Sequence, residues 1–131
     1  MKRIVILAAM GILFAISAFA QAQVEKTVSR HVFTSAIVDR EPIDTITAIT
    51  PDEATSVYYF TELNNMQNTT ARHVWTKNDA ILYEMPVTVN GARWRTFSSM
   101  RTIQFTAGDD VLVEVIGEDG HVYATDTLTI Q

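Results

Sequence analysis

The residues whose types are best suited to ligand binding or chemistry lie together in one stretch, NGARWRTFSSMR at 90–101. In an extended strand, successive side chains point to opposite faces. Arg93, Arg95, Phe97 and Ser99 then share one face, whereas Trp94, Thr96 and Ser98 share the other. The stretch therefore predicts a strand that places two arginines beside a phenylalanine, with the indole of Trp94 on the far side.

Two interpretations of these arginines are open. A guanidinium group binds carboxylate or phosphate groups through paired hydrogen bonds, so Arg93 and Arg95 are candidates for an anionic ligand. Alternatively they pair with internal acids, for which Glu62 and Glu84 are the candidates. The chain has 15 acidic against 10 basic residues, and this excess of acids favours the second interpretation.

A second group of candidate binding residues is His73 with Trp75, which share one strand face. If their strand lies beside 93–99, they would form an aromatic and cationic patch with the arginines. Aromatic rings with polar neighbours suit sugars, because they contact apolar ring faces while polar groups bind hydroxyls. The alternative is that Trp75 and Trp94 are core residues and that His73 is hydrogen-bonded locally.

Catalytic and metal-binding patterns are weak. Glu62 and Glu84 could serve as the two carboxylates of a glycosidase, and this small hydrolase is the remote alternative. Ser98 and Ser99 lack the motif of a nucleophile elbow. The three histidines are scattered without the spacing of a zinc site. We therefore expect no catalytic residues, no metal and no cofactor.

The N-terminus has the features of a secretory signal peptide. Lys2 and Arg3 precede an apolar run at 4–20, and the small residues of AFAQA at 18–22 follow. We predict a cleaved signal peptide at 1–22, cut after Ala22 or alternatively after Ala20, and a single domain at 23–131. An uncleaved anchor is the alternative, but the run is short for a membrane span. The predicted location is the periplasm or the extracellular space, without stable membrane insertion after cleavage.

Composition limits the partners of the mature chain. Cysteine is absent, so neither a disulfide framework nor a cysteine-based metal site is available. Removal of Lys2 and Arg3 leaves 10 − 2 = 8 basic residues against 15 acids, a net charge of 8 − 15 = −7. Nucleic-acid binding is disfavoured because it requires a basic surface.

The mature sequence reads as short strands rich in β-branched and aromatic residues, separated by turn residues. Strands are predicted at 28–38, 43–49, 56–63, 70–77, 80–89, 93–105, 110–117 and 121–130. Asn90-Gly91 is the strongest hairpin signal, of the type I′ kind, and Lys77-Asn78-Asp79 is a second. The predicted fold is all-β, a single antiparallel two-sheet β-sandwich, Ig-like, with seven to eight strands.

Four tracts carry a resemblance to a known family: FTSAIVDREP at 33–42, YYFTEL at 58–63, HVW at 73–75 and RWRTFSS at 93–99. The chain resembles the uncharacterised bacterial domain-of-unknown-function family 2914 over roughly residues 30–130. The resemblance implies a small extracytoplasmic domain ending in two strands joined by a turn such as Glu118-Asp119-Gly120. It implies no activity, and it makes Glu62, Trp94, Ser98 and Ser99 a structural signature.

One position departs from the family pattern. A lysine is expected directly after the paired serines, whereas this chain has Met100 followed by Arg101. Arg101 is therefore a further binding candidate. Taken together, the sequence predicts an exported, non-catalytic binding module for an unknown protein or glycan partner. The alternative is a carbohydrate-binding or enzyme-accessory module that uses the aromatic and arginine patch.

Overall fold

The computed structural model describes residues 24–131. The predicted signal peptide at 1–22 lies outside this range. Within the described range, no helix has both the length and the apolar character needed to cross a membrane.

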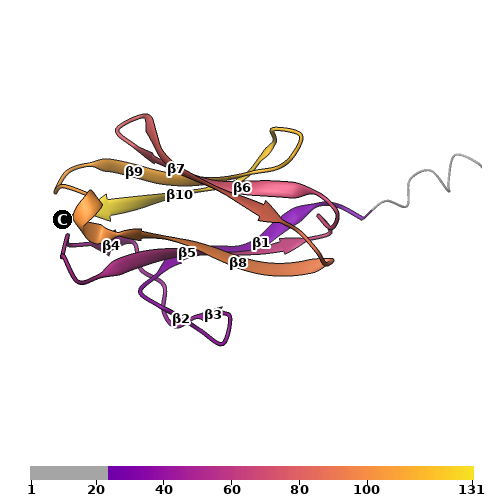
Figure 1. Ribbon diagram of the computed structural model, residues 1–131, viewed down its shortest axis with the longest axis horizontal. Helices are drawn as coiled ribbons and strands as arrows, with labels where there is room; N and C mark the ends of the chain where they lie inside the picture. Colours follow the sequence, from indigo (N-terminus) through magenta and orange to yellow (C-terminus); the bar gives the residue numbers. More distant parts are fainter. Residues whose placement is uncertain (1–23) are drawn as a thin grey trace, which may run out of the picture.

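The described residues form two sheets stacked face to face (Figure 1). The smaller sheet has the order β1-β5-β8, with β1 at Thr27–Thr34, β5 at Ser56–Asn64 and β8 at Arg93–Arg101. The larger has the order β4-β10-β9-β6-β7. Its strands are β4 (Ala48–Ile49), β10 (Val122–Ile130), β9 (Asp110–Ile116), β6 (Thr70–Lys77) and β7 (Ala80–Thr88). A short hairpin of β2 (Ile37–Val38) and β3 (Glu41–Pro42) lies on the outer side of the smaller sheet.

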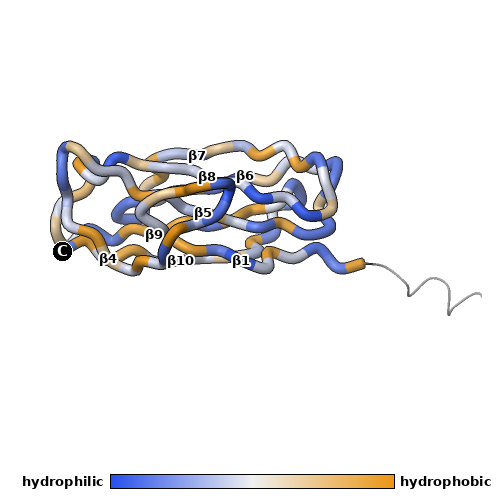
Figure 2. The backbone as a smooth tube through the Cα atoms, turned by 90° about the horizontal axis from the view of Figure 1, so that it is seen from below, coloured by the Kyte–Doolittle hydropathy of each residue, from blue (hydrophilic) through white to orange (hydrophobic). Residues whose placement is uncertain are grey.

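Alternating side chains build the core between the sheets. On β9, Val111, Val113 and Val115 are fully buried, and the residues between them are partly exposed. On β5, Tyr59 and Leu63 point into the same core. Hydrophobic and hydrophilic positions alternate along the strands in Figure 2. This period of two is what a sheet with one buried face requires.

The predicted fold class is confirmed: the described chain is all-β, with antiparallel sheets packed as a sandwich. The strand order is compatible with the expected Ig-like arrangement. Among the described strands, the long neighbours pair antiparallel, and the short β4 runs parallel to its partner β10. The hairpin predicted at Asn78-Asp79 joins β6 to β7, and both residues have the positive φ of a type I′ turn.

The hairpin predicted at Asn90-Gly91 is wrong. Strand β7 pairs with β6 and β8 pairs with β5, so this segment carries the chain from one sheet to the other. Neither residue has a positive φ. The backbone of Val89 and Ala92 is hydrogen-bonded to residues 65–69, which form the other connection between the sheets at this end. The backbone groups of this segment are therefore hydrogen-bonded to the neighbouring connection and not to each other across a hairpin turn.

The first two predicted strands and the end of the sixth also differ from the structure. The strand predicted at 28–38 ends at Thr34, because the side chain of Asp44 binds the Thr34 hydroxyl and the Ser35 amide and turns the chain outward. The strand predicted at 43–49 is reduced to β4. The one predicted at 93–105 ends at Arg101, and a short 3-10 helix, η1 (Thr102–Gln104), follows.

Candidate functional site

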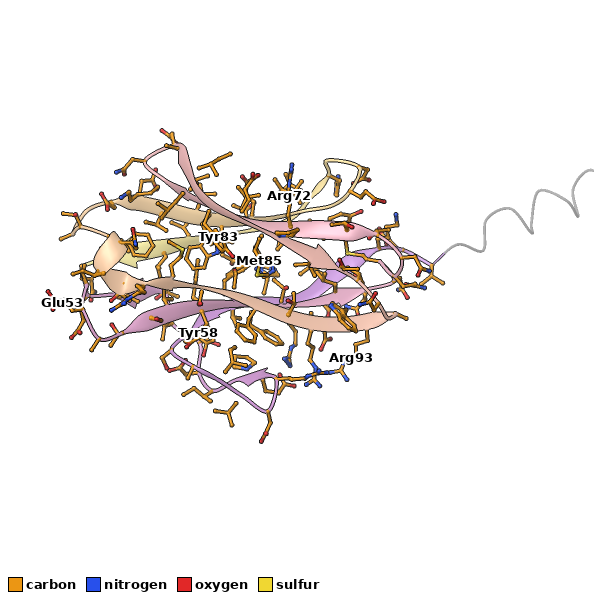
Figure 3. The ribbon with its side chains drawn as sticks, viewed as in Figure 1. Glu53, Tyr58, Arg72, Tyr83, Met85 and Arg93 are labelled. Carbon is orange, nitrogen blue, oxygen red and sulfur yellow. The ribbon has the colours of Figure 1, made fainter. Side chains whose placement is uncertain are left out.

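The outer face of the smaller sheet carries the arginines of β8. Arg93, Arg95 and Phe97 lie on this face, as the alternation predicts, while Trp94 packs against the core cluster. Figure 3 shows Arg93 on the side of the sandwich where the β2–β3 hairpin lies. It also shows Arg72 on the outer face of the other sheet. The fold thus separates these two arginines by the full thickness of the sandwich.

Both arginines of the strip bind internal carboxylates. Arg93 Nε and Nη2 donate to Glu62 Oε1 at 3.1 and 2.9 Å. Arg95 Nη1 donates to Glu41 Oε1 at 3.0 Å. Glu62 is one of the two predicted partners. Glu41, on the β2–β3 hairpin, was not predicted as a partner. It was missed because the proline-containing tract at 40–42 is typical of a strand end and does not by itself indicate a hairpin that folds back onto the sheet.

Glu41 is shared between two strands. Besides Arg95 on β8, it forms a close bidentate ion pair with Arg30 on β1. The Arg30 guanidinium also lies over the Phe60 ring, 4.7 Å from its centroid, in a cation–π contact. A single carboxylate on the hairpin therefore ties it to both edge strands of the smaller sheet, across the buried ring of Phe60 on the central strand.

Glu62 is held ionised beneath the arginines. Its side chain is 10% exposed, and the Ser29 hydroxyl donates to Oε2 at 2.9 Å. The hydrogen bond from Arg93 lowers the pKa of the Glu62 carboxyl, and partial burial opposes this shift. The fixed negative charge of Glu62 in turn orients the Arg93 side chain, which is 63% exposed.

A groove opens between the hairpin and β8. Its volume is about 340 Å³, near the lower end of the range for small-molecule sites. It is lined by Arg40, Phe60, Arg93, Trp94, Arg95, Thr96 and Phe97. Arg40 stands at the tip of the hairpin and has no ion pair within residues 24–131. We call this feature the arginine groove.

The arginine groove is a positive region on an acidic protein. Three of the 8 basic residues of the described chain line it, Arg40, Arg93 and Arg95, and a fourth, Arg30, is joined to this face through its ion pair with Glu41. The nearby acids are Glu41 and Glu62, so the net charge of these four arginines and two acids is 4 − 2 = +2, or +1 if the adjacent turn residue Asp39 is counted. The whole described chain carries 8 − 15 = −7. The fold has concentrated scarce positive charge on one face.

The aromatic patch expected from His73 and Trp75 requires correction, because neither side chain reaches the surface. Both are fully buried between the sheets. His73 Nδ1 and Nε2 lie 2.7 Å from Ser98 Oγ and 2.9 Å from Thr61 Oγ1, and Trp75 Nε1 donates to Ser98 Oγ at 2.9 Å. Burial lowers the pKa of His73 to about 3, so the imidazole is neutral. The cluster is a hydrogen-bonded part of the core.

The remaining candidates are dispersed. Arg101 lies at the other end of β8, where Nη2 donates to the backbone carbonyl of Glu53 at 2.6 Å. Ser98 is buried, whereas Ser99 is exposed on the outer face. Glu84 lies opposite Val74 on the outer face of the larger sheet, 3.9 Å from Arg72. Glu62 is on the outer face of the smaller sheet, so the proposed glycosidase pair of Glu62 and Glu84 is not formed.

A separate polar cluster links the two sheets at one edge. Asp126 Oδ2 on β10 accepts a hydrogen bond from the Tyr59 hydroxyl at 2.6 Å and lies 2.5 Å from His31 Nδ1 on β1. Burial and the neighbouring carboxylate raise the pKa of Tyr59. The described residues contain no group of three or more acidic, histidine or cysteine side chains arranged to hold a metal ion.

Comparison with known proteins gives a match to a family model and no activity. No curated protein matches the chain. The match to a family model covers five strands, β6 to β10, and includes the HVW and RWRTFSS tracts. It is shorter than the expected 30–130 and leaves out the β2–β3 hairpin and β5. Over residues 68–130, this chain matches the family described as "Protein of unknown function (DUF2914)".

Proposed function

We propose that this chain is an exported, non-catalytic binding domain that holds a ligand with oxyanion groups in the arginine groove. The observation that carries the proposal is the gathering of Arg40, Arg93 and Arg95 along one groove of a protein with a net charge of −7. Guanidinium groups that line a concave surface are suited to bidentate binding of such ligands.

The internal ion pairs leave capacity for a ligand. A guanidinium has five N–H donors. Arg93 directs Nε and Nη2 to Glu62, and Arg95 directs Nη1 to Glu41. Within residues 24–131, the other donors of both side chains and those of Arg40 have no internal acceptor. Internal pairing and ligand binding are therefore compatible, and the internal acids fix the arginines in position.

Export is supported by the N-terminal sequence alone. Lys2, Arg3, the apolar run at 4–20 and the small residues at 18–22 have the order of a cleaved signal peptide. N-terminal sequencing of the mature protein should begin at Gln23, or at Gln21 if cleavage follows Ala20. A protein that keeps Met1 and sediments with membranes would contradict this part of the proposal.

The binding proposal is tested by titrating the ¹⁵N-labelled protein with citrate and following backbone amide shifts. Sodium chloride of equal ionic strength is the control for screening. We expect saturable shifts of the Arg40, Thr96 and Phe97 amides with citrate only. Equal shifts with sodium chloride, or shifts centred on Arg72 on the opposite face, would overturn the proposal.

A second candidate function, carbohydrate binding, is favoured by one observation. Phe97 is 44% exposed and lines the arginine groove, so its ring is available to an apolar sugar face. This platform replaces the buried His73 and Trp75. It is distinguished from simple anion binding by whether a neutral sugar shifts the Phe97 amide in the same titration.

A further inference from the structure

The tip of the β2–β3 hairpin has an unusual backbone. Asp39 and Arg40 both have positive φ, 52° and 62°. This conformation is unfavourable for residues with a Cβ, although asparagine and aspartate adopt it most readily. In residues 24–131, every other non-glycine residue with positive φ is Asn or Asp, so Arg40 is the exception. The two-residue turn between Val38 and Glu41 requires positive φ at both of its central positions, and arginine is an uncommon residue at the second of them.

The hairpin that carries Arg40 is firmly anchored. At its base, Asp44 accepts hydrogen bonds from the Thr34 hydroxyl and the Ser35 amide at 2.7 and 2.8 Å, and the Ile43 amide donates to the Ala36 carbonyl at 3.2 Å. Near its tip, Glu41 binds Arg30 and Arg95. Arg40 is thus presented to the groove by a fixed arm, which reduces the ordering that a ligand must supply.

The acceptors already bound on this face indicate the group that a ligand would bring. Arg30, Arg93 and Arg95 all bind glutamate carboxylates, Glu41 or Glu62. The planar guanidinium matches a carboxylate through two parallel hydrogen bonds. Arg40 lines the same groove without an internal acid. A carboxylate of the ligand would complete the set.

One exposed aromatic ring lines the groove, and a second ring packs beside it. Phe97 is 44% exposed, and the Tyr58 ring contacts its edge with centroids 5.9 Å apart. These rings offer an apolar surface next to the guanidinium groups. A ligand that uses both would have an apolar ring face with a carboxylate attached to it.

We infer that the arginine groove takes an acidic sugar chain of the uronate type, whose carboxylate is bound by Arg40 and whose ring lies on Phe97. This inference rests on the proposed binding function and names its ligand class. Arg40 is the residue that determines specificity for the carboxylate. No bond is made or broken, because the site only binds.

The test is calorimetric titration of the purified protein with trigalacturonate at fixed ionic strength. Maltotriose serves as the neutral sugar and tetraglutamate as a carboxylate-bearing peptide. We expect saturable binding of trigalacturonate and at least tenfold weaker binding of both other probes. Equal affinity for maltotriose would overturn the role of the carboxylate, and equal affinity for tetraglutamate would overturn the assignment to sugars.

Matched variants then locate the site. Arg40→Asn should weaken trigalacturonate binding by about 10- to 100-fold, the usual effect of losing a hydrogen-bonded charge. It should leave the Tm unchanged or raised, because asparagine tolerates the backbone of the tip. Arg72→Gln removes the same charge from the opposite face and should leave the affinity unchanged. Phe97→Ala, at an exposed site, should weaken binding without loss of the fold.

The results separate this inference from the proposed function. If citrate binds in the groove but trigalacturonate does not, anion binding stands and the sugar assignment fails. If trigalacturonate binds equally to wild type and Arg40→Asn, the role of the hairpin tip is refuted. If neither citrate nor trigalacturonate binds, both proposals are overturned.

Discussion

Acidification should destabilise this protein through one buried histidine. His73 is fully buried, and burial lowers its pKa to about 3 from the ordinary value of 6.5. As pH falls below 6.5, the unfolded chain takes up a proton at this position while the folded chain does not. The stability contributed by the neutral imidazole is therefore fully present above pH 6.5 and is lost progressively down to about pH 3.

The size of the loss in unfolding free energy follows from the difference between the pH and the pKa of His73 in the unfolded chain. Each pH unit below 6.5 costs about 1.4 kcal/mol, so the free energy of unfolding should fall by about 2 kcal/mol between pH 7.5 and pH 5.0. The acids Asp44, Glu62 and Asp109 have lowered pKa values, so the stability they contribute is lost as pH falls from their ordinary pKa values of 3.8 to 4.5 toward the lower folded values, almost entirely below pH 5.

The assay is urea unfolding at the two pH values, followed by the fluorescence of Trp75 and Trp94, which lie in or against the core. His73→Gln is the matched variant, since it retains hydrogen-bonding groups and does not titrate. We expect the pH-dependent loss to be about 2 kcal/mol smaller in the variant than in wild type. An equal loss in the two proteins would refute the reasoning. If the variant does not fold, an NMR titration of the wild-type His73 ring decides the matter, and a ring shift centred near pH 6.5 would refute it.

Three further predictions concern single positions. Ser98→Ala should lower the free energy of unfolding by about 1–3 kcal/mol, because it leaves buried polar groups of His73 and Trp75 without a partner. The control Ser99→Ala, at an exposed position, should change it by no more than about 0.5 kcal/mol, and equal effects in urea unfolding would contradict the buried cluster. Gly91→Ala should be neutral or stabilising by up to about 1 kcal/mol, whereas Gly120→Ala, at φ 84°, should be destabilising. Tm values in the reverse order would support the hairpin predicted at Asn90-Gly91. Arg95→Ala should lower stability by about 0.5–1 kcal/mol, since its pair with Glu41 is partly exposed and screened, and an unchanged Tm would show that this ion pair is not structural.

Local patterns predicted the strands and their faces well. The alternation on β8 depends only on the two-residue period of a strand, and it placed Arg93 and Arg95 on one face and Trp94 on the other correctly. The turn at Asn78-Asp79 was equally readable, because both residue types tolerate positive φ. Such features are determined within a few residues and can therefore be read without knowledge of the partner strands.

What could not be read depends on contacts distant in sequence. The same turn chemistry gave a hairpin at Asn78-Asp79 and a crossing between sheets at Asn90-Gly91, and only the pairing of β8 with β5 distinguishes the two. Glu41 meets Arg95 across 54 residues. A surface role for His73 looked plausible because a buried histidine needs polar partners, and these come from Thr61 and Ser98 on other strands.

The crossing at Asn90-Gly91 has a consequence for how the chain acquires its structure. It divides strands that are adjacent in sequence between two sheets, so neither sheet is made from one contiguous segment. Residues 68–130, the part that matches DUF2914, include β8 but not β5, with which β8 pairs in the described part of the chain. A fragment with these boundaries would leave β8 unpaired and one side of the core open to water. The unit that folds is therefore larger than the unit that is matched. Both sheets depend on pairings between strands that are distant in sequence, and we expect slow folding for that reason.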